Sequence, residues 1–127
     1  MTDLRIAFFG SPAFALTSLE IINQEHHLAL VISQPDKPAG RGLSKLPPPV
    51  AIWASRNEIP LLQPKTLKTN SVFRDKFIQA NCDVAVTVAY GKILPENLLQ
   101  IPPYGFLNAH ASLLPSYRGA APIQWAL

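Results

Sequence analysis

An amide and an imidazole stand two residues apart at the end of a short apolar run. Asn108 and His110 follow Phe106 and Leu107 within the stretch GFLNAHASLLPSYRGAAP, residues 105–122. Side chains alternate between the two faces of a strand, so a strand here would place Asn108 and His110 on the same face. An amide N–H can stabilise a developing oxyanion, and an imidazole can transfer protons. The sequence therefore predicts a catalytic pair at a strand end.

The alternative interpretation of this pair is structural, because a lone buried histidine is commonly a hydrogen-bonded core residue. A Ser-Leu-Leu-Pro turn and Arg118 follow the pair, which favours the functional interpretation. No convincing nucleophile accompanies it: Ser112 lacks a GxSxG elbow, and Cys82 lies at the wrong end of its strand. We expect direct transfer between two bound substrates rather than a covalent enzyme intermediate.

Apolar runs along the rest of the chain predict the elements that must position this pair. Nearly continuous runs suit strands buried on both faces of a parallel sheet, and amphipathic segments between them suit helices. The alternation predicts an α/β fold with a doubly wound, mostly parallel sheet, in which ligands bind beyond the carboxyl ends of the strands. The predicted strands are 4–9, 28–32, 59–62, 83–89 and the run from Gly105, and the predicted helices are 12–23, 51–58, 69–81 and 95–100.

The turn after the first predicted strand does not fit a dinucleotide site. It holds the single glycine Gly10, where a dinucleotide fingerprint needs three. Ser11 is expected to cap the following helix and Pro12 to occupy its first position. A capped helix is favoured here over an anion site.

Residues 33–49 are rich in proline, glycine and charge and have no hydrophobic period, so we expect a long loop. Lys37, Arg41 and Lys45 outnumber the acidic Asp36 in it. A mobile basic loop can follow a phosphate backbone without reading sequence. A solvated surface loop explains the same charges equally well.

Composition restricts the remaining possibilities. The 127 residues carry a net charge of +3, and 48% of them are hydrophobic, which suits one domain with a real core. No apolar stretch approaches the roughly 18 residues of a membrane span, and no signal peptide is recognisable. The single cysteine, Cys82, is expected to be a small buried residue. We expect a cytoplasmic protein without a membrane partner.

The stretch from Asn108 to Trp125 closely resembles the signature of the folate-dependent formyltransferases. Three further stretches resemble the same family: FGSP with FA at 9–15, QPDKPAGRG at 34–42 and VAYG at 88–91. The family includes members that formylate glycinamide ribonucleotide or amino sugars, and all of them share the Asn-x-His strand. The loop at 34–42 is similar to that of the members that act on tRNA, in which it enters the acceptor arm.

This resemblance implies a reaction and a set of residues. A formyl group would pass from 10-formyltetrahydrofolate to the amine of initiator methionyl-tRNA, with Asn108 and His110 as catalytic residues and no metal. The intact protein would be a monomer. The resemblance implies folate contacts by Ser112, Leu113, Leu114, Pro115, Val88, Ala89 and Tyr90, and tRNA contacts by Lys37, Arg41 and Lys45.

The resemblance also implies a Rossmann-like formyltransferase fold of which residues 1–127 are the N-terminal part. Pro122 to Leu127 is expected to begin a helix. The remaining strands, an aspartate partner for His110 and a C-terminal domain are expected to be missing, so we expect the chain alone to be inactive. Two alternatives remain: a formyltransferase for a sugar-nucleotide amine, and a non-catalytic fragment that binds folate or RNA.

Overall fold

The computed structural model describes residues 3–39, 44–109 and 123–125. No helix in these ranges is long and apolar enough to cross a membrane. The helical segments are a 3₁₀ turn η1 (Ala13–Ala15), α1 (Leu16–Glu25), α2 (Pro49–Arg56), α3 (Ser71–Gln79) and α4 (Glu96–Leu99). The strands are β1 (Arg5–Gly10), β2 (His27–Ile32), β3 (Lys37–Ala39), β4 (Ser44–Leu46), β5 (Leu61–Leu62), β6 (Val84–Val88), β7 (Phe106–Ala109) and β8 (Ile123–Trp125).

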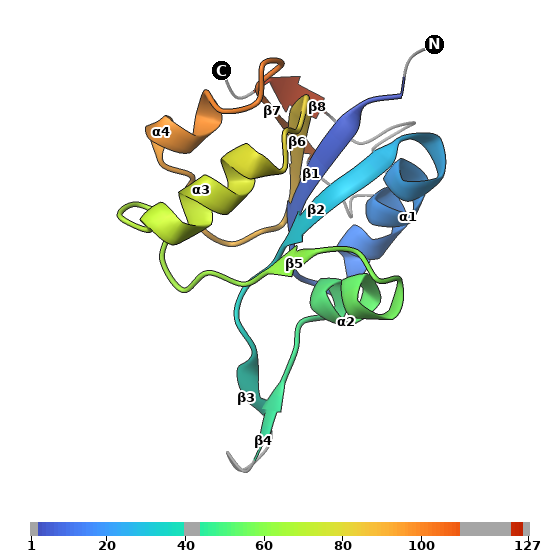
Figure 1. Cartoon of the computed structure of the whole chain (residues 1–127). Helices are drawn as coiled ribbons and strands as arrows, with labels where there is room; N and C mark the ends of the chain where they lie inside the picture. Colours follow the sequence, from blue (N-terminus) through green and yellow to red (C-terminus); the bar gives the residue numbers. More distant parts are fainter. Residues whose placement is uncertain (1–2, 40–43, 110–122, 126–127) are drawn as a thin grey trace.

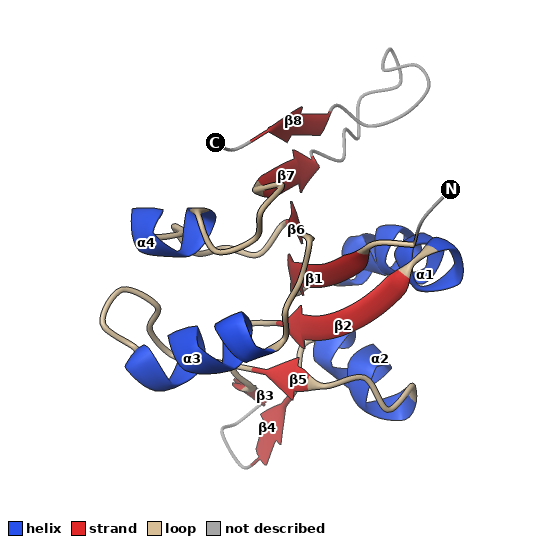
Figure 2. Cartoon of the chain, turned by 45° about the horizontal axis from the view of Figure 1, so that its top comes forward, coloured by secondary structure: helices blue, strands red, loops and turns tan. Residues whose placement is uncertain are grey.

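Six of the strands form one sheet in the order β5-β2-β1-β6-β7-β8 (Figure 2). The first five strands in this order are parallel, and β8 is antiparallel to β7. The chain begins at β1, continues outward to β2 and β5, and then returns to β6 on the other side of β1. The predicted doubly wound, mostly parallel sheet is confirmed, and its topological switch point lies between β1 and β6.

Helices cover both faces of the sheet, with α1 and α2 on one side and α3 and α4 on the other (Figure 1). The β1 strand supplies both cores, because Ile6 and Phe8 pack toward α1 and α2 while Phe9 packs toward α3 and α4. The Phe9 ring lies 5.3 Å from the ring of Phe106 and 5.6 Å from that of Phe77. The apolar run at 4–9 therefore indicated a doubly buried strand correctly.

The prediction of a loop without secondary structure over residues 33–49 is wrong in one respect. It contains an antiparallel hairpin of β3 and β4, which pair as a separate two-stranded sheet and project beyond the carboxyl edge of the main sheet (Figure 1). Each strand has three residues, and Pro38 cannot donate a backbone hydrogen bond. Such short strands leave no hydrophobic period for the sequence to reveal.

Two expectations about helix starts are also wrong. The first helical segment opens as the 3₁₀ turn η1 after Pro12, with no side-chain cap, because the Ser11 hydroxyl bonds elsewhere. The segment expected to open a helix at Pro122 instead contains β8. A β-branched and an aromatic residue, Ile123 and Trp125, favour a strand, and β8 covers the outer edge of β7.

A cluster of charged side chains closes the amino-terminal edge of the sheet. The Arg5 guanidinium donates to the carbonyl oxygens of Ala80 (2.7 Å) and Asn81 (3.0 Å), just beyond the end of α3. The Asp83 carboxylate accepts the Arg5 backbone N–H at 2.8 Å. These bonds join β1 to the connection between α3 and β6, at the end of the sheet opposite the hairpin.

Candidate functional site

A pocket of about 580 Å³ lies where β6 and β7 end. Asn108, half-buried at the end of β7, contributes to its wall together with Thr87 of β6. The remaining wall is mostly apolar and comes from the turn after β6, from α4 and from η1. The other lining residues are Phe14, Ala89, Tyr90, Gly91, Lys92, Ile93, Leu94, Leu99 and Ala109.

The Asn108 side chain is oriented by a neighbouring strand. Thr87 pairs with Asn108 across β6 and β7, and its Oγ1 donates to Asn108 Oδ1 at 2.9 Å. Thr87 is buried, so little water competes for this bond. Because the amide oxygen faces Thr87, the amide nitrogen is directed away from it. The amide group of Asn108 therefore lies at the carboxyl edge of the sheet in an orientation set by Thr87.

The backbone between β6 and Lys92 has an unusual conformation. Ala89 and Gly91 have φ angles of 52° and 91°, in the left-handed region on both sides of Tyr90. For a residue with a Cβ this conformation costs roughly 1–2 kcal/mol, so surrounding contacts must hold Ala89 in place. Strain of this kind is concentrated at ligand sites in proteins. The segment Ala89–Gly91 is therefore a candidate for ligand contact.

A second pocket, of about 550 Å³, lies on the other side of this segment. Ala89, Tyr90 and Gly91 line both pockets and form their shared wall. The second pocket is closed by the turn after β1, by the base of the hairpin and by the prolines before α2. Its other lining residues are Ser11, Pro12, Gln34, Lys37, Pro38, Leu46, Pro47, Pro48 and Pro49.

Hydrogen bonds tie the shared wall to the ends of β1 and β2. The Gln34 side chain donates from Nε2 to the Tyr90 carbonyl oxygen at 3.1 Å, and the Ser11 hydroxyl donates to the same oxygen at 3.5 Å. The Gln34 backbone N–H donates to Ser11 Oγ at 3.0 Å. The Tyr90 carbonyl is thus already bonded within the protein, and its place in the wall is fixed by these contacts.

The Tyr90 side chain faces the core rather than a ligand. Its ring lies edge-on to Phe9, with the centroids 5.3 Å apart, and its hydroxyl is buried without a hydrogen-bond partner among the described residues. Burial raises the Tyr90 pKa to about 12. The phenol therefore stays protonated near neutral pH and is not a suitable general base there.

Several of the predicted site residues can be placed. Asn108 lies at a strand's carboxyl end, and the alternation of side chains places it on the same side of the sheet as Phe106. Ala89 and Tyr90 line a pocket, whereas the Val88 side chain is buried in the core beneath α1 and α2. Six further predicted residues lie outside the described residues: His110, Ser112, Leu113, Leu114, Pro115 and Arg41.

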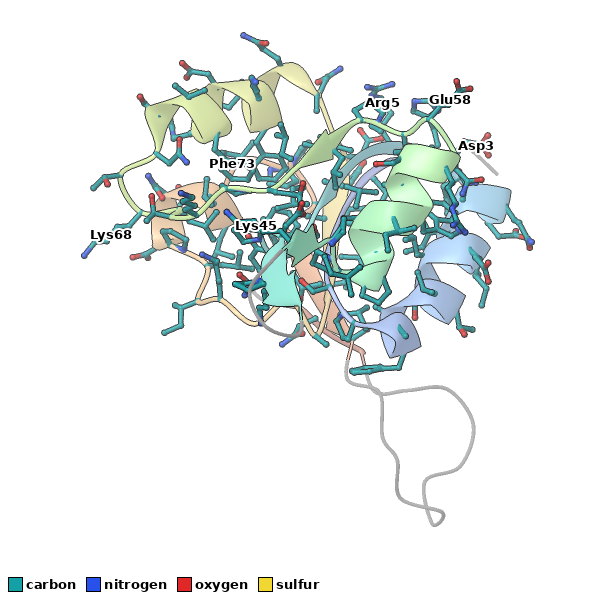
Figure 3. All side chains as sticks on the ribbon, turned by 90° about the horizontal axis from the view of Figure 1, so that it is seen from below. Asp3, Arg5, Lys45, Glu58, Lys68 and Phe73 are labelled. Carbon is teal, nitrogen blue, oxygen red and sulfur yellow. The ribbon has the colours of Figure 1, made fainter. Side chains whose placement is uncertain are left out.

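The two placed lysines of the predicted tRNA site, Lys37 and Lys45, are exposed on the hairpin (Figure 3 labels Lys45). Lys37 pairs with Leu46 and Lys45 pairs with Pro38. Directly opposed residues share a face and successive residues alternate, so the two lysines lie on opposite faces of the hairpin. The hairpin therefore presents positive charge on both sides rather than as one patch.

Three polar residues of the site were missed in the sequence. Thr87 is the only polar residue in the buried strand VAVTV, and that exception could have identified it. Gln34 lies two residues after β2 and Gln63 directly after β5, but they meet their partners only through the fold. Within the described ranges, no group of three or more His, Cys, Asp and Glu side chains is arranged to hold a metal ion.

Comparisons with known proteins show the family and the fold of this chain. A sequence model described as formyl transferase matches residues 4–127, almost the whole chain. The chain belongs to the formyl transferase family. Among solved structures, a glycinamide ribonucleotide transformylase from Geobacillus kaustophilus has a TM-score of 0.61 at 20% identity, over 93% of this chain and 63% of that one. At that identity the likeness supports the shared fold alone.

Relatives within the formyl transferase family are much more similar in sequence. A methionyl-tRNA formyltransferase from Deinococcus radiodurans is 58% identical over 123 residues, which are 97% of this chain and 39% of the relative. One from Thermus thermophilus is 52% identical over 98% of this chain and 40% of the relative. The chain thus spans about 40% of the length of the curated relatives it matches.

Proposed function

We propose that this chain contributes to an enzyme that transfers a formyl group from 10-formyltetrahydrofolate to the α-amine of methionyl-tRNA. The observation that carries the proposal is the position of Asn108, held by Thr87 at the carboxyl end of β7 and open to a pocket beside the topological switch point. Identities of 50–58% to relatives named methionyl-tRNA formyltransferase support the choice of acceptor.

The two pockets fit two substrates that must meet. The pocket that contains Asn108 is largely apolar and suits the flat pterin ring of the donor. The second pocket opens at the base of the basic hairpin and suits the aminoacyl end of the acceptor. Because Ala89, Tyr90 and Gly91 line both pockets, the two substrates would bind next to each other.

The proposed reaction is a direct acyl transfer. The amine nitrogen forms a bond to the formyl carbon, and the resulting tetrahedral oxyanion accepts a hydrogen bond from the Asn108 amide. Cleavage of the bond to N10 then releases tetrahydrofolate. In this proposal His110 carries the proton lost by the amine to the departing N10, so no metal or covalent enzyme intermediate is needed.

We further propose that residues 1–127 form the N-terminal part of a catalytic domain. The family match across residues 4–127 and the 39–40% coverage of the relatives support this assignment. The aspartate that orients His110 would then lie on a segment outside these residues, as would a C-terminal domain that helps to hold tRNA. The isolated 127-residue chain is accordingly expected to have no formylation activity.

A formylation assay tests the function directly. A full-length formyltransferase that carries these 127 residues is incubated with 10-formyltetrahydrofolate and either methionyl-tRNA or an amino-sugar nucleotide. Formylation of methionyl-tRNA alone is the expected result. Formylation of the sugar nucleotide would replace the proposed acceptor. Donor binding without any turnover would favour a non-catalytic binding protein.

A further inference from the structure

We propose that Gln34 is a positioning residue that couples the donor pocket to the acceptor-binding hairpin. The inference rests on the proposed function for the identity of the two substrates. Gln34 follows β2 and precedes the hairpin, yet its side chain reaches 56 residues along the chain to the wall between the pockets. It therefore links the two halves of the site physically.

The first half of the link holds the wall of the donor pocket. Gln34 Nε2 donates to the Tyr90 carbonyl at 3.1 Å, in the middle of the left-handed segment. A Cβ added at Gly91 would lie only 2.9 Å from the same nitrogen. The amide of Gln34 thus fits against a backbone that has both a left-handed φ and no side chain. A shift of Gln34 would move this segment or release it.

The second half of the link holds the base of the hairpin. Gln63 Nε2 donates both to the Gln34 carbonyl (3.1 Å) and to Asp36 Oδ1 (2.8 Å), one residue before β3 begins. The Ser33 hydroxyl, which is fully buried, donates to the same Gln34 carbonyl at 3.0 Å. Displacement of the hairpin by a bound acceptor would therefore be transmitted to Gln34.

Gln34 also lines the second pocket, so an acceptor seated there would meet it directly. Its side chain also supports the Ala89–Gly91 wall that the two pockets share. A ligand in one pocket therefore changes how firmly the wall of the other pocket is held. Such a coupling must be reciprocal: a bound acceptor tightens donor binding by the same factor as a bound donor tightens acceptor binding. A ligand in either pocket would thus order the Ala89–Gly91 segment for the ligand in the other pocket.

The test uses Gln34→Met, which keeps the length of the side chain and removes its donor. Tetrahydrofolate is titrated into the full-length enzyme with and without methionyl-tRNA, a pair that binds without reacting. In the unaltered enzyme we expect methionyl-tRNA to tighten tetrahydrofolate binding at least about fivefold. The coupling ratio is the Kd of tetrahydrofolate without methionyl-tRNA divided by its Kd with methionyl-tRNA. In Gln34→Met we expect this ratio to be near one. We also expect the KM for the donor to rise about tenfold and kcat to change by less than about threefold.

Matched variants separate coupling from general damage. Gln79→Met makes the same chemical change on the exposed surface of α3 and should leave the ratio unaltered. Gln63→Met cuts the hairpin side of the link and should abolish the ratio while tetrahydrofolate binding alone stays normal; it also serves if Gln34→Met does not fold. An intact ratio in the folded variants, or no ratio in the unaltered enzyme, would overturn the inference. Because the titration needs no turnover, it can fail while formylation succeeds, or the reverse.

Discussion

The Asn108 amide depends on a hydroxyl group from the neighbouring strand. The hydrogen bond from Thr87 Oγ1 holds the amide oxygen of Asn108 toward Thr87. It therefore sets the direction of the amide N–H groups. An oxyanion is stabilised only by donors that already occupy the right place before the charge develops. Two predictions follow from this arrangement, one for the amide and one for the hydroxyl.

Replacement of Asn108 by alanine removes the proposed oxyanion donor. We expect turnover of the full-length enzyme to fall about 10²–10³-fold, with little change in donor affinity, because the interaction forms mainly in the transition state. Steady-state kinetics and a tetrahydrofolate titration measure the two effects separately. From the sequence we expect the same for His110→Ala. Near-normal turnover in both variants would contradict the assignment.

Thr87→Val removes the hydroxyl and keeps the shape of the side chain. We expect kcat to fall up to about tenfold, because the amide loses one of the contacts that orient it. Thr87→Ser retains the hydroxyl and should restore most of the rate. If valine and serine behave alike in kcat and KM, packing rather than the hydrogen bond is what matters at this position.

Residues of the site differed in how far the sequence could reveal them. Asn108 was recognisable because a polar residue in an apolar strand requires an explanation. The Gln34–Tyr90 and Gln63–Asp36 bonds were not recognisable, since they join residues 56 and 27 positions apart and follow no periodicity. The left-handed φ of Ala89 was equally hidden, because alanine carries no preference for it.

At the scale of elements, the hairpin of β3 and β4 places its charges on two faces. A surface that lies against one side of the hairpin can meet only one of Lys37 and Lys45, whereas a groove that surrounds it meets both. If the hairpin binds tRNA as proposed, this charge distribution favours insertion between two phosphate backbones over docking on one of them.

Lys37→Ala and Lys45→Ala test this geometry. In the full-length enzyme, each is expected to weaken tRNA binding and to lower the salt dependence by about one phosphate contact. Arg41→Ala is expected to do the same. Tetrahydrofolate binding should not change. Lys76→Ala, an exposed position on α3, is the control. A loss confined to one face of the hairpin would rule out insertion.

The Arg5 side chain gives a prediction about the opposite edge of the sheet. Arg5→Met keeps the apolar stem and removes the donors to the Ala80 and Asn81 carbonyls. We expect the free energy of unfolding to fall by about 1–2 kcal/mol, because these carbonyls lose charged partners. Urea denaturation measures it, with the exposed Arg74→Met on α3 as the control. An unchanged stability would show that water replaces the guanidinium without cost.

Long apolar strands were the elements best predicted from sequence. The runs at 4–9 and 83–89 became β1 and β6, whose alternating residues are buried on both faces. The hairpin and β8 were missed because strands of three residues have too few positions to establish a pattern. Ser11 was assigned to a helix cap since its partners, Gln34 and Tyr90, are distant in sequence.

At the scale of the whole molecule, the buried Cys82 thiol and the buried Tyr90 phenol make the free energy of unfolding depend on pH in the alkaline range. Burial raises the Cys82 pKa from 9.0 to about 11 and the Tyr90 pKa from 10.0 to about 12. Above pH 9 the unfolded chain loses protons that the folded chain keeps. The folded state then binds more protons, so its free energy of unfolding decreases as pH rises.

We therefore expect stability to hold up to about pH 8.5 and then to fall, by at most about 1.4 kcal/mol per pH unit for each group. Urea denaturation at a series of pH values measures the fall. Cys82→Ala should make the fall in unfolding free energy shallower above pH 9, and Tyr90→Phe should do so above pH 10. Parallel curves for the variants and the unaltered protein would mean that other groups cause the alkaline loss.

The hairpin has a consequence for how such a fold can diversify. Within the part of the chain that the structure describes, its strands pair only with each other, and side-chain bonds from Gln63 tie its base to the main sheet. The described residues of β3 and β4 belong to neither core, so exchanging these strands leaves the six-stranded sheet intact. If the proposed function holds, a lineage could acquire a new acceptor by replacing this hairpin while retaining Asn108 and the proposed donor pocket. Transplanting a hairpin between relatives would be the laboratory equivalent of that step.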